Sequence, residues 1–346
     1  MKKMIKLSLV AAMSVASLNT VASAADVDYS GKLYVENYVG TEEVGSADAV
    51  NTSGFEIDFD VTGKAKVTDN LTAVVGLEAD SDRKEYAGAA NEGVDVDDAH
   101  FVYAKGDATV IFGRQAIDTP TTDGENGEGT LASYKFGNFT AVGAYFENND
   151  VVASSTASAL ALLGKAGPVN LELWQVGVSD HSTHNTAVLS VEAAGWTIGG
   201  RLATSTYDAA GAKDGSTMII SAAGKVSNIG LTAALLTTHE DGAAFVTDAS
   251  SANTAELVHF TAKGHADTTA TIVTASMPVS DDTSVALKFG TASIGDDDTA
   301  SEVVLQANYK LAKSTTLTAR YASYTQDVSD VETNKTQGRV DLTYKF

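Results

Sequence analysis

Along most of the chain, apolar and polar residues alternate one by one over segments of roughly ten residues. Between 54 and 67, for example, Phe55, Ile57 and Phe59 begin an apolar series at every second position, with acidic and other polar residues between them. A period of two places successive side chains on opposite faces of a β-strand. The same alternation recurs at 71–80, 283–294, 301–311, 315–325 and 336–346. The chain is therefore predicted to be all-β.

The connections between these segments alternate between two lengths. Short turns are predicted at 68–70, 105–107, 137–138, 166–168, 194–195, 227–230, 280–282 and 312–314. Longer polar loops are predicted at 39–53, 81–95, 115–130, 148–157, 179–185, 206–214, 239–268, 295–300 and 326–335. This layout is typical of outer-membrane barrels, and it predicts a transmembrane antiparallel β-barrel of about 18 strands. A count of 16 is the alternative, because the segment within 239–268 fits either a hairpin arm in a long loop or a strand.

A soluble β-sandwich or solenoid is the competing fold. Strands of about ten residues suit a membrane crossing, whereas soluble strands are usually nearer five or six residues. The polar face is also heavily charged, and a buried sandwich core would not tolerate that charge. Past residue 25, no stretch approaches the ~20 apolar residues that a membrane helix requires. The pattern therefore favours a membrane barrel whose polar face lines a water-filled lumen.

The first residues are predicted to be a targeting segment. Lys2, Lys3 and Lys6 precede an apolar stretch that ends in small residues at 22–24, which is the pattern of a cleaved secretory signal. An N-terminal membrane anchor is the alternative, but the apolar run is short and is interrupted by polar residues. We therefore expect a signal peptide at 1–24 and an exported barrel at 25–346, located in the bacterial outer membrane.

Composition narrows the range of partners. The formal charge of −22 becomes −25 without the three lysines of the signal, so nucleic acid, which needs a basic surface, is excluded as a partner. The chain has no cysteine, so a closed hydrogen-bonded sheet or a core has to hold the fold without disulfides.

The last predicted strand runs to Phe346 without a polar tail. A barrel closes by pairing its last strand with its first, and this arrangement would place Phe346 at the periplasmic interface, where aromatic side chains collect. Four further aromatic residues are predicted to share this outward girdle near the short turns: Tyr29, Trp196, Tyr309 and Tyr344. Trp174 is the exception, because its position in the alternation faces inward.

The chain also resembles a known family. Its aromatic end resembles the assembly signal of bacterial outer-membrane proteins, which implies the barrel assembly machinery as a partner of Phe346. The stretch "VIFGRQAIDTPTTDGENGEGTLASYKFGNFTAVGAYFENN" (110–149) resembles the third loop and flanking strands of Gram-negative trimeric porins. The wording "GRQAIDTP" and the strand count are most similar to the major outer-membrane porins of the Campylobacter group.

This resemblance implies a function and an assembly. Residues 115–130 would fold inward as a constriction loop, and the chain would form a homotrimer amid outer-membrane lipid and lipopolysaccharide. The expected activity is passive diffusion of ions and small hydrophilic solutes through the lumen, with no catalysis.

Charged residues on the inward face suggest how such a lumen would be filtered. Counting residues from the strand ends puts six cations at one height, as the basic side of a constriction: Lys32, Arg114, Arg201, Lys288, Arg320 and Arg339. The predicted constriction loop supplies the acidic side: Asp118, Asp123, Glu125 and Glu128. An acidic outer vestibule is predicted above that level: Glu36, Glu56, Asp58, Glu78 and Asp80. Solvated lumen charges without a special role are the alternative, and the acidic excess predicts mild cation preference.

Other patterns carry less information. Acidic clusters at 95–98, 123–128 and 296–298 offer oxygen ligands for Ca²⁺ but lack the spacing of a Ca²⁺ loop, so no cofactor is expected. His181 and His184 have a spacing seen in metal sites but no third ligand nearby in the sequence, which favours a surface loop. The sequence contains no G-x-S-x-G, P-loop or H-E-x-x-H motif. The alternative function is an adhesin or receptor that acts through external loops such as 239–268.

Overall fold

A computed structural model describes residues 27–84, 94–122, 124–152, 154–247 and 256–346, with the side chains of 80–84 excluded. The predicted signal peptide at 1–24 and Asp123 lie outside the described residues. The described chain forms eighteen strands: β1 (Val27–Val44), β2 (Val50–Lys66), β3 (Leu71–Lys84), β4 (Asp95–Lys105), β5 (Ala108–Ala116), β6 (Asn126–Phe136), β7 (Phe139–Asn149), β8 (Ala157–Ala166), β9 (Val169–Val178), β10 (Ser182–Ala193), β11 (Trp196–Tyr207), β12 (Gly215–Val226), β13 (Ile229–Thr238), β14 (Thr268–Pro278), β15 (Thr283–Ile294), β16 (Asp298–Ala312), β17 (Thr315–Val328) and β18 (Val331–Lys345).

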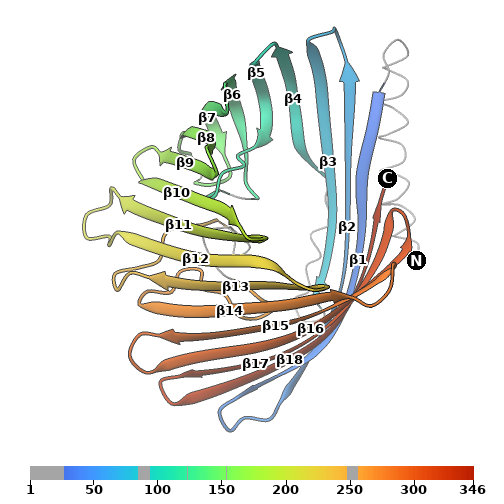
Figure 1. Cartoon of the computed structure of the whole chain (residues 1–346), viewed down its shortest axis with the longest axis vertical. Helices are drawn as coiled ribbons and strands as arrows, with labels where there is room; N and C mark the ends of the chain where they lie inside the picture. The colour runs from blue at the N-terminus through green and yellow to red at the C-terminus, as the bar shows by residue number, and fades with distance from the viewer. Residues whose placement is uncertain (1–26, 85–93, 123, 153, 248–255) are drawn as a thin grey trace.

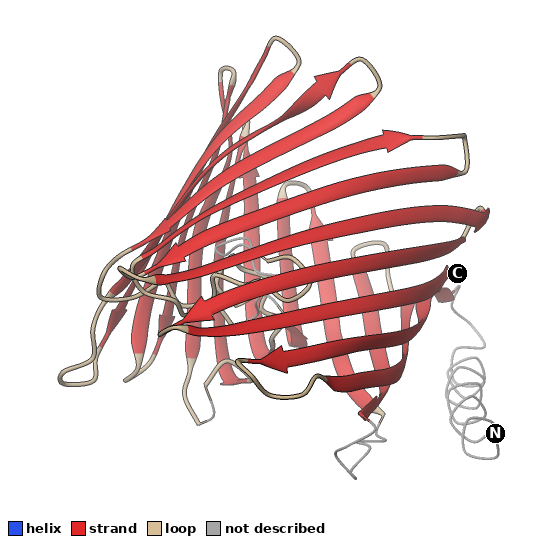
Figure 2. Ribbon diagram, turned by 90° about the horizontal axis from the view of Figure 1, so that it is seen from below, coloured by secondary structure: helices blue, strands red, loops and turns tan. Residues whose placement is uncertain are grey.

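Each strand pairs antiparallel with its neighbours in sequence, and β1 also pairs with β18, so the sheet closes on itself (Figures 1 and 2). The prediction of an antiparallel barrel is confirmed, with 18 strands and not 16. The ambiguous segment between β13 and β14 contributes no strand among its described residues; it shows isolated bridges at His239–Gly242 and Glu256–Thr261. No helix in the described residues is long and apolar enough to cross a membrane.

All eight short turns lie where the alternation predicted them, at one end of the barrel. At the other end, several connections are shorter than predicted because the strands run further. The predicted loop 39–53 is reduced to 45–49, and the predicted loop 326–335 is reduced to 329–330. Polar residues at these strand ends still pair in the sheet, as Glu42 does with Lys335. Polarity alone therefore overestimates loop length in a barrel whose strands extend beyond the membrane.

The outer face is mostly apolar. Large exposed side chains cover it, among them Phe112 (63% exposed) and Leu160 (61% exposed). Hydrocarbon, and not water, is the solvent that suits this surface. Of the predicted girdle, Tyr309, Tyr344 and Phe346 are exposed on it. Trp174 faces inward as predicted, and its buried indole Nε1 has no hydrogen-bond partner among the described residues.

The inner face is of two kinds. On β18 and β1 to β4 it is charged, as the alternation predicts. On β7, β8 and β13 to β16 several inward positions are apolar and buried: Phe146, Ala157, Leu236, Ala270, Ala292 and Ala300. Apolar inward positions would be wet in an empty lumen, and here inward-folded loop segments cover them.

Candidate functional site

The described residues of the connection between β5 and β6 lie inside the barrel. Ile117 packs against Phe146 and Ala157 on the inner faces of β7 and β8. The Thr122 hydroxyl donates to the Ile117 carbonyl at 2.6 Å and also contacts the Thr119 hydroxyl at 2.7 Å. These contacts form a tight, buried turn on the wall. The loop spans 117–125, which is shorter than the predicted 115–130.

The connection between β13 and β14 has 29 residues, and its described parts, 239–247 and 256–267, include segments that pack against the inner wall. Its first part lies on β10 to β12. The Phe245 ring stacks on His184, with ring centroids 4.9 Å apart, and the Phe245 N–H donates to the Ser205 hydroxyl at 2.7 Å. The Ala244 N–H donates to the Thr217 hydroxyl at 3.0 Å. Hydroxyls on the inner wall therefore supply partners for loop backbone that would otherwise lose its hydrogen bonds.

The two inward loops meet each other. The Thr247 N–H donates to the Thr121 carbonyl at 3.0 Å, although the two residues are 126 positions apart. The Lys263 ammonium, from the second part of the long loop, donates to the Thr247 carbonyl at 2.5 Å. The described parts of both loops thus form one connected structure along the inner wall from β7 to β17.

The second part of the long loop, 256–262, lies on β13 to β17. Phe260 is buried in a cluster with Leu236, Ala262 and Tyr324 and with the inward alanines of β14, β15 and β16. The backbone N–H groups of His259 and Phe260 donate to the carboxylate of Glu302 on β16.

An ion-pair network lies on β17, β18 and β1, beside the wall that the second part of the long loop covers. Arg339 binds Asp341 and Glu36, each with a nitrogen–oxygen distance of 2.7 Å. Arg320, directly across from Arg339, forms an ion pair with the same Asp341 at 3.1 Å. The Tyr34 hydroxyl donates to Glu36 at 2.5 Å and accepts from Arg339. Arg320 and Arg339, two of the four predicted constriction arginines, are therefore held and largely neutralised by carboxylates.

The neighbouring wall, on β1 to β4, is acidic. Its inward carboxylates include Glu56, Asp58, Asp60, Glu78, Asp97 and Asp98. Lys32 forms an ion pair with Asp60 at 3.0 Å, and a carboxylate oxygen of Asp98 lies 3.3 Å from Nδ1 of His100. Lys64 and Lys66 share this face only near the short turn. The middle of this wall carries excess negative charge.

Two predicted constriction residues do not face the lumen. Arg114 shares the outward face of Phe112, and Glu128 lies directly across from it on β6. Arg114 forms an ion pair with Asp150 at 2.9 Å, and Asn148 donates to Glu128 at 3.0 Å. These four side chains form a polar cluster on the outer face near the external rim. The strand parity excludes both residues from the constriction.

Lys32 also lies at a different height from Arg320 and Arg339. Lys32 pairs in register with Lys345, whereas Arg339 pairs with Tyr38, six residues further along β1. At ~3.3 Å per residue this separates Lys32 from the arginine pair by about 20 Å along the strand. Counting from strand ends ignores the stagger between neighbouring strands of a barrel, so Lys32 does not join Arg320 and Arg339 in one basic wall.

Most of the remaining predicted site residues lie on the inner wall or on the inward loop. Arg201, Lys288, Arg320 and Arg339 face inward. Asp118 is exposed and Glu125 half-buried on the inward loop. Glu36 is buried beside Arg339 and does not stand in an open vestibule. Glu56, Asp58 and Glu78 lie on the inner wall, and the side chain of Asp80 lies outside the described residues.

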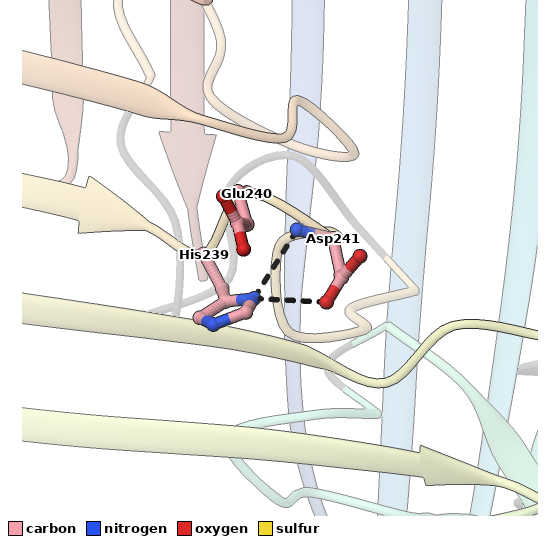
Figure 3. A group of neighbouring side chains, drawn as sticks. All are labelled: His239, Glu240 and Asp241. Atoms are coloured by element: carbon pink, nitrogen blue, oxygen red, sulfur yellow. Dashed lines mark hydrogen bonds and ion pairs between the residues drawn. The ribbon is translucent and has the colours of Figure 1, made fainter.

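His239, Glu240 and Asp241 gather their ligand atoms within 4.8 Å of one another on the long loop (Figure 3). All three are exposed, and the Lys213 ammonium already contacts Asp241 at 2.7 Å. The hydrogen bond and positive charge of Lys213 lower the pKa of Asp241. The contacts at this cluster are those of an exposed ion pair.

The prediction that His181 and His184 lie in a surface loop is wrong for His184. His184 is buried on the inner wall of β10, between the hydroxyls of Ser182 and Ser205, each at 2.8 Å. It supports Phe245 of the long loop.

Sequence reasoning did not identify Glu302, Asp341 or the inward position of 244–247 and 256–262. Apolar residues at inward positions of β13 to β16 were the available signal, because an open aqueous lumen would leave them wet.

The comparisons with known proteins agree with this architecture. Residues 1–148 match the family model described as Campylobacter major outer membrane protein, which confirms the resemblance over a stretch that includes the 117–125 loop. No curated protein sequence matches the chain.

Solved outer-membrane barrels have the same fold. OpdK from Pseudomonas aeruginosa is 13% identical, with a TM-score of 0.73, and the match covers 92% of this chain and 98% of that one. OccAB1 of Acinetobacter baumannii is 14% identical, with a TM-score of 0.72 and coverages of 92% and 97%. OccK2 (OpdF) of P. aeruginosa is 12% identical, with a TM-score of 0.72 and coverages of 92% and 98%. At these identities the likeness shows the fold.

Proposed function

We propose that the chain is an outer-membrane porin that forms a water-filled channel for passive diffusion of ions and small hydrophilic solutes, with mild preference for cations. One observation carries this proposal: the described loop segments lie on the inner wall from β7 to β17, and the opposite wall, on β18 and β1 to β4, is lined with charge. Charged side chains require water, so this wall borders the aqueous path.

The direction of selectivity follows from the charge of that wall. The arginines at β17 and β18 are paired with Asp341 and Glu36, so they contribute little net positive charge. The carboxylates of β1 to β4 outnumber the cations beside them at mid-height. Cations are therefore concentrated in the path and anions repelled.

The alternative, an adhesin or receptor, would place its work in long external loops. The longest connection, 239–267, has its described parts inside the barrel, which supports a channel over a surface receptor.

The proposal includes a homotrimer in contact with outer-membrane lipid and lipopolysaccharide, as the family resemblance implies. It also includes export through a cleaved signal at 1–24 and recognition of Phe346 by the barrel assembly machinery.

Planar bilayer recordings test the proposal. Refolded mature protein should insert with stepwise conductance, in groups of three steps for a trimer, and a KCl gradient should give a reversal potential that favours K⁺. A reversal potential that favours Cl⁻ would contradict the selectivity. A folded barrel without conductance would contradict the channel itself.

A further inference from the structure

Glu302 is a buried carboxylate whose hydrogen-bond donors come from a loop. Its side chain is 1% exposed on the inner face of β16. The His259 N–H lies 3.1 Å from both carboxylate oxygens, and the Phe260 N–H lies 2.9 Å from one of them. Successive backbone N–H groups that converge on one anion form a compact cradle for negative charge.

The surroundings of Glu302 explain why this contact matters. Its inward neighbours on β16 are Ala300 and Val304, both buried, so the carboxylate stands on an apolar part of the wall. Lys288 is on the adjacent strand and is diagonal to Glu302 in register. A buried carboxylate is stable only when its oxygens are hydrogen-bonded. The backbone of the loop provides those bonds, so the wall and the loop depend on each other.

Shape complementarity supports the same contact. Phe260 is 1% exposed on a platform of inward alanines. Beside it, Leu257 lies so close to Gly290 that a Cβ there would be 2.6 Å from the leucine Cδ1. The segment 256–262 is therefore held against the wall by its backbone hydrogen bonds to the Glu302 carboxylate and by the apolar contacts of Leu257 and Phe260.

The described flanking chain has contacts of its own, independent of Glu302. Residues 244–247 are bonded to β11, β12 and Thr121, and Thr268 begins β14. A segment released from Glu302 would remain tethered at both sides, and it would sample the water-filled part of the cross-section.

We propose that Glu302 is a positioning residue that holds 256–262 against the wall and thereby keeps the passage clear. This inference rests on the proposed channel function. In this proposal Glu302, which lies outside the predicted constriction, determines how often the open pore closes.

The test compares Glu302→Ala and Glu302→Gln with a matched control, Glu172→Gln, which removes the same charge from the inner wall of β9. Single-channel recordings should show brief closures whose total time rises roughly tenfold in Glu302→Ala, the size expected for losing hydrogen bonds to a charged group. Glu302→Gln should give a smaller rise in the same direction. The control should keep the wild-type closure frequency, and heat-modifiable migration in gels should show that every variant is folded.

A disulfide supplies the second arm, because the chain has no cysteine of its own. The pair Leu257→Cys and Gly290→Cys should cross-link readily in the wild-type background and slowly with Glu302→Ala. Once oxidised, it should suppress the closures of Glu302→Ala. Wild-type closure frequency in Glu302→Ala, or an unchanged cross-linking rate, would overturn the inference. A wild-type barrel that does not conduct would overturn the proposed function instead, while the cross-linking rate would still report on the anchor.

Discussion

The backbones of Gly31 and Phe346 exchange two hydrogen bonds of 3.1 Å each, one in each direction. The Phe346 ring lies over Gly31, where a Cβ would come within 2.4 Å of it, and it stacks on Phe59 and Tyr344. The seam between β1 and β18 is thus completed by an aromatic ring that covers a glycine.

Substitution of Gly31 should weaken this seam. In Gly31→Val the new side chain would meet both Phe346 and the Asp60 carbonyl, which lies 2.4 Å from the Cβ position. We expect a loss of about 1–3 kcal/mol, the usual cost of overpacking, and a lower temperature of heat modification in gels. Gly200→Ala, where nothing lies within 4 Å of an added Cβ, is the control and should behave as wild type.

Cation preference should depend on lumen acids and not on outer ones. The double variant Asp118→Asn and Glu125→Gln removes two charges from the inward loop, so the reversal potential under a KCl gradient should move toward zero. Glu128→Gln removes one charge from the outer face and should leave the reversal potential unchanged. An equal effect of Glu128→Gln would contradict the outward placement of that residue.

The carboxylate of Asp341 should be important for stability. It is 2% exposed and forms ion pairs with both Arg320 and Arg339. Asp341→Asn leaves two lumen guanidiniums without their shared partner, and we expect a loss of about 3–5 kcal/mol. Asp60→Asn breaks the more exposed pair with Lys32 and should cost at most ~1 kcal/mol. Denaturant unfolding in detergent compares the two, and similar losses would show that burial of Asp341 is not what matters.

Acid should loosen the long loop through His259. Burial lowers the pKa of His259, and the positive charge of Lys335 lowers this pKa further, against an opposing effect of Glu42. The ring also lies beside Tyr324, 6.0 Å between centroids, while the adjacent backbone binds Glu302. Because the docked loop favours neutral His259, the released loop binds more protons. Docking is therefore fully stable above the ordinary histidine pKa of ~6.5 and is weakened as pH falls below it.

Channel recordings at about pH 5 and pH 7.5 check this sign, since the two values bracket the ordinary histidine pKa. Wild type should close more often at the lower pH, and His259→Asn should lose part of that difference. Glu302→Gln, recorded in parallel, separates the carboxyl contribution from that of the imidazole. A wild-type channel that closes less often in acid would contradict the prediction.

The wall of the barrel was predictable because each strand and turn is determined by residues that are close together in the sequence. Alternation such as that of Phe55, Ile57 and Phe59 reports which face meets lipid, and turn residues report where each hairpin ends. The seam was predictable for the same reason, since Phe346 continues the outward series of Val340, Leu342 and Tyr344.

The interior was only partly predictable because its contacts join residues that are far apart in the sequence. The distance between Lys32 and Arg339 depends on stagger summed over the barrel, which no single strand records. The pairing of Arg320 with Asp341 depends on the register between β17 and β18. In the sequence, Phe260 is one apolar residue in a polar loop. Its buried position depends on the inward alanines of β14, β15 and β16, which no local pattern links to it.

The inward path of the long loop has a consequence for the order of assembly. Its contacts reach from Thr121 to Tyr324, so its docking surface exists only after most strands of the barrel have paired. Contacts of such long sequence separation form late, because the intervening chain must first be ordered. A newly closed barrel is therefore expected to pass through a wide, leaky stage, and its maturation into a selective filter is a separate and final folding event.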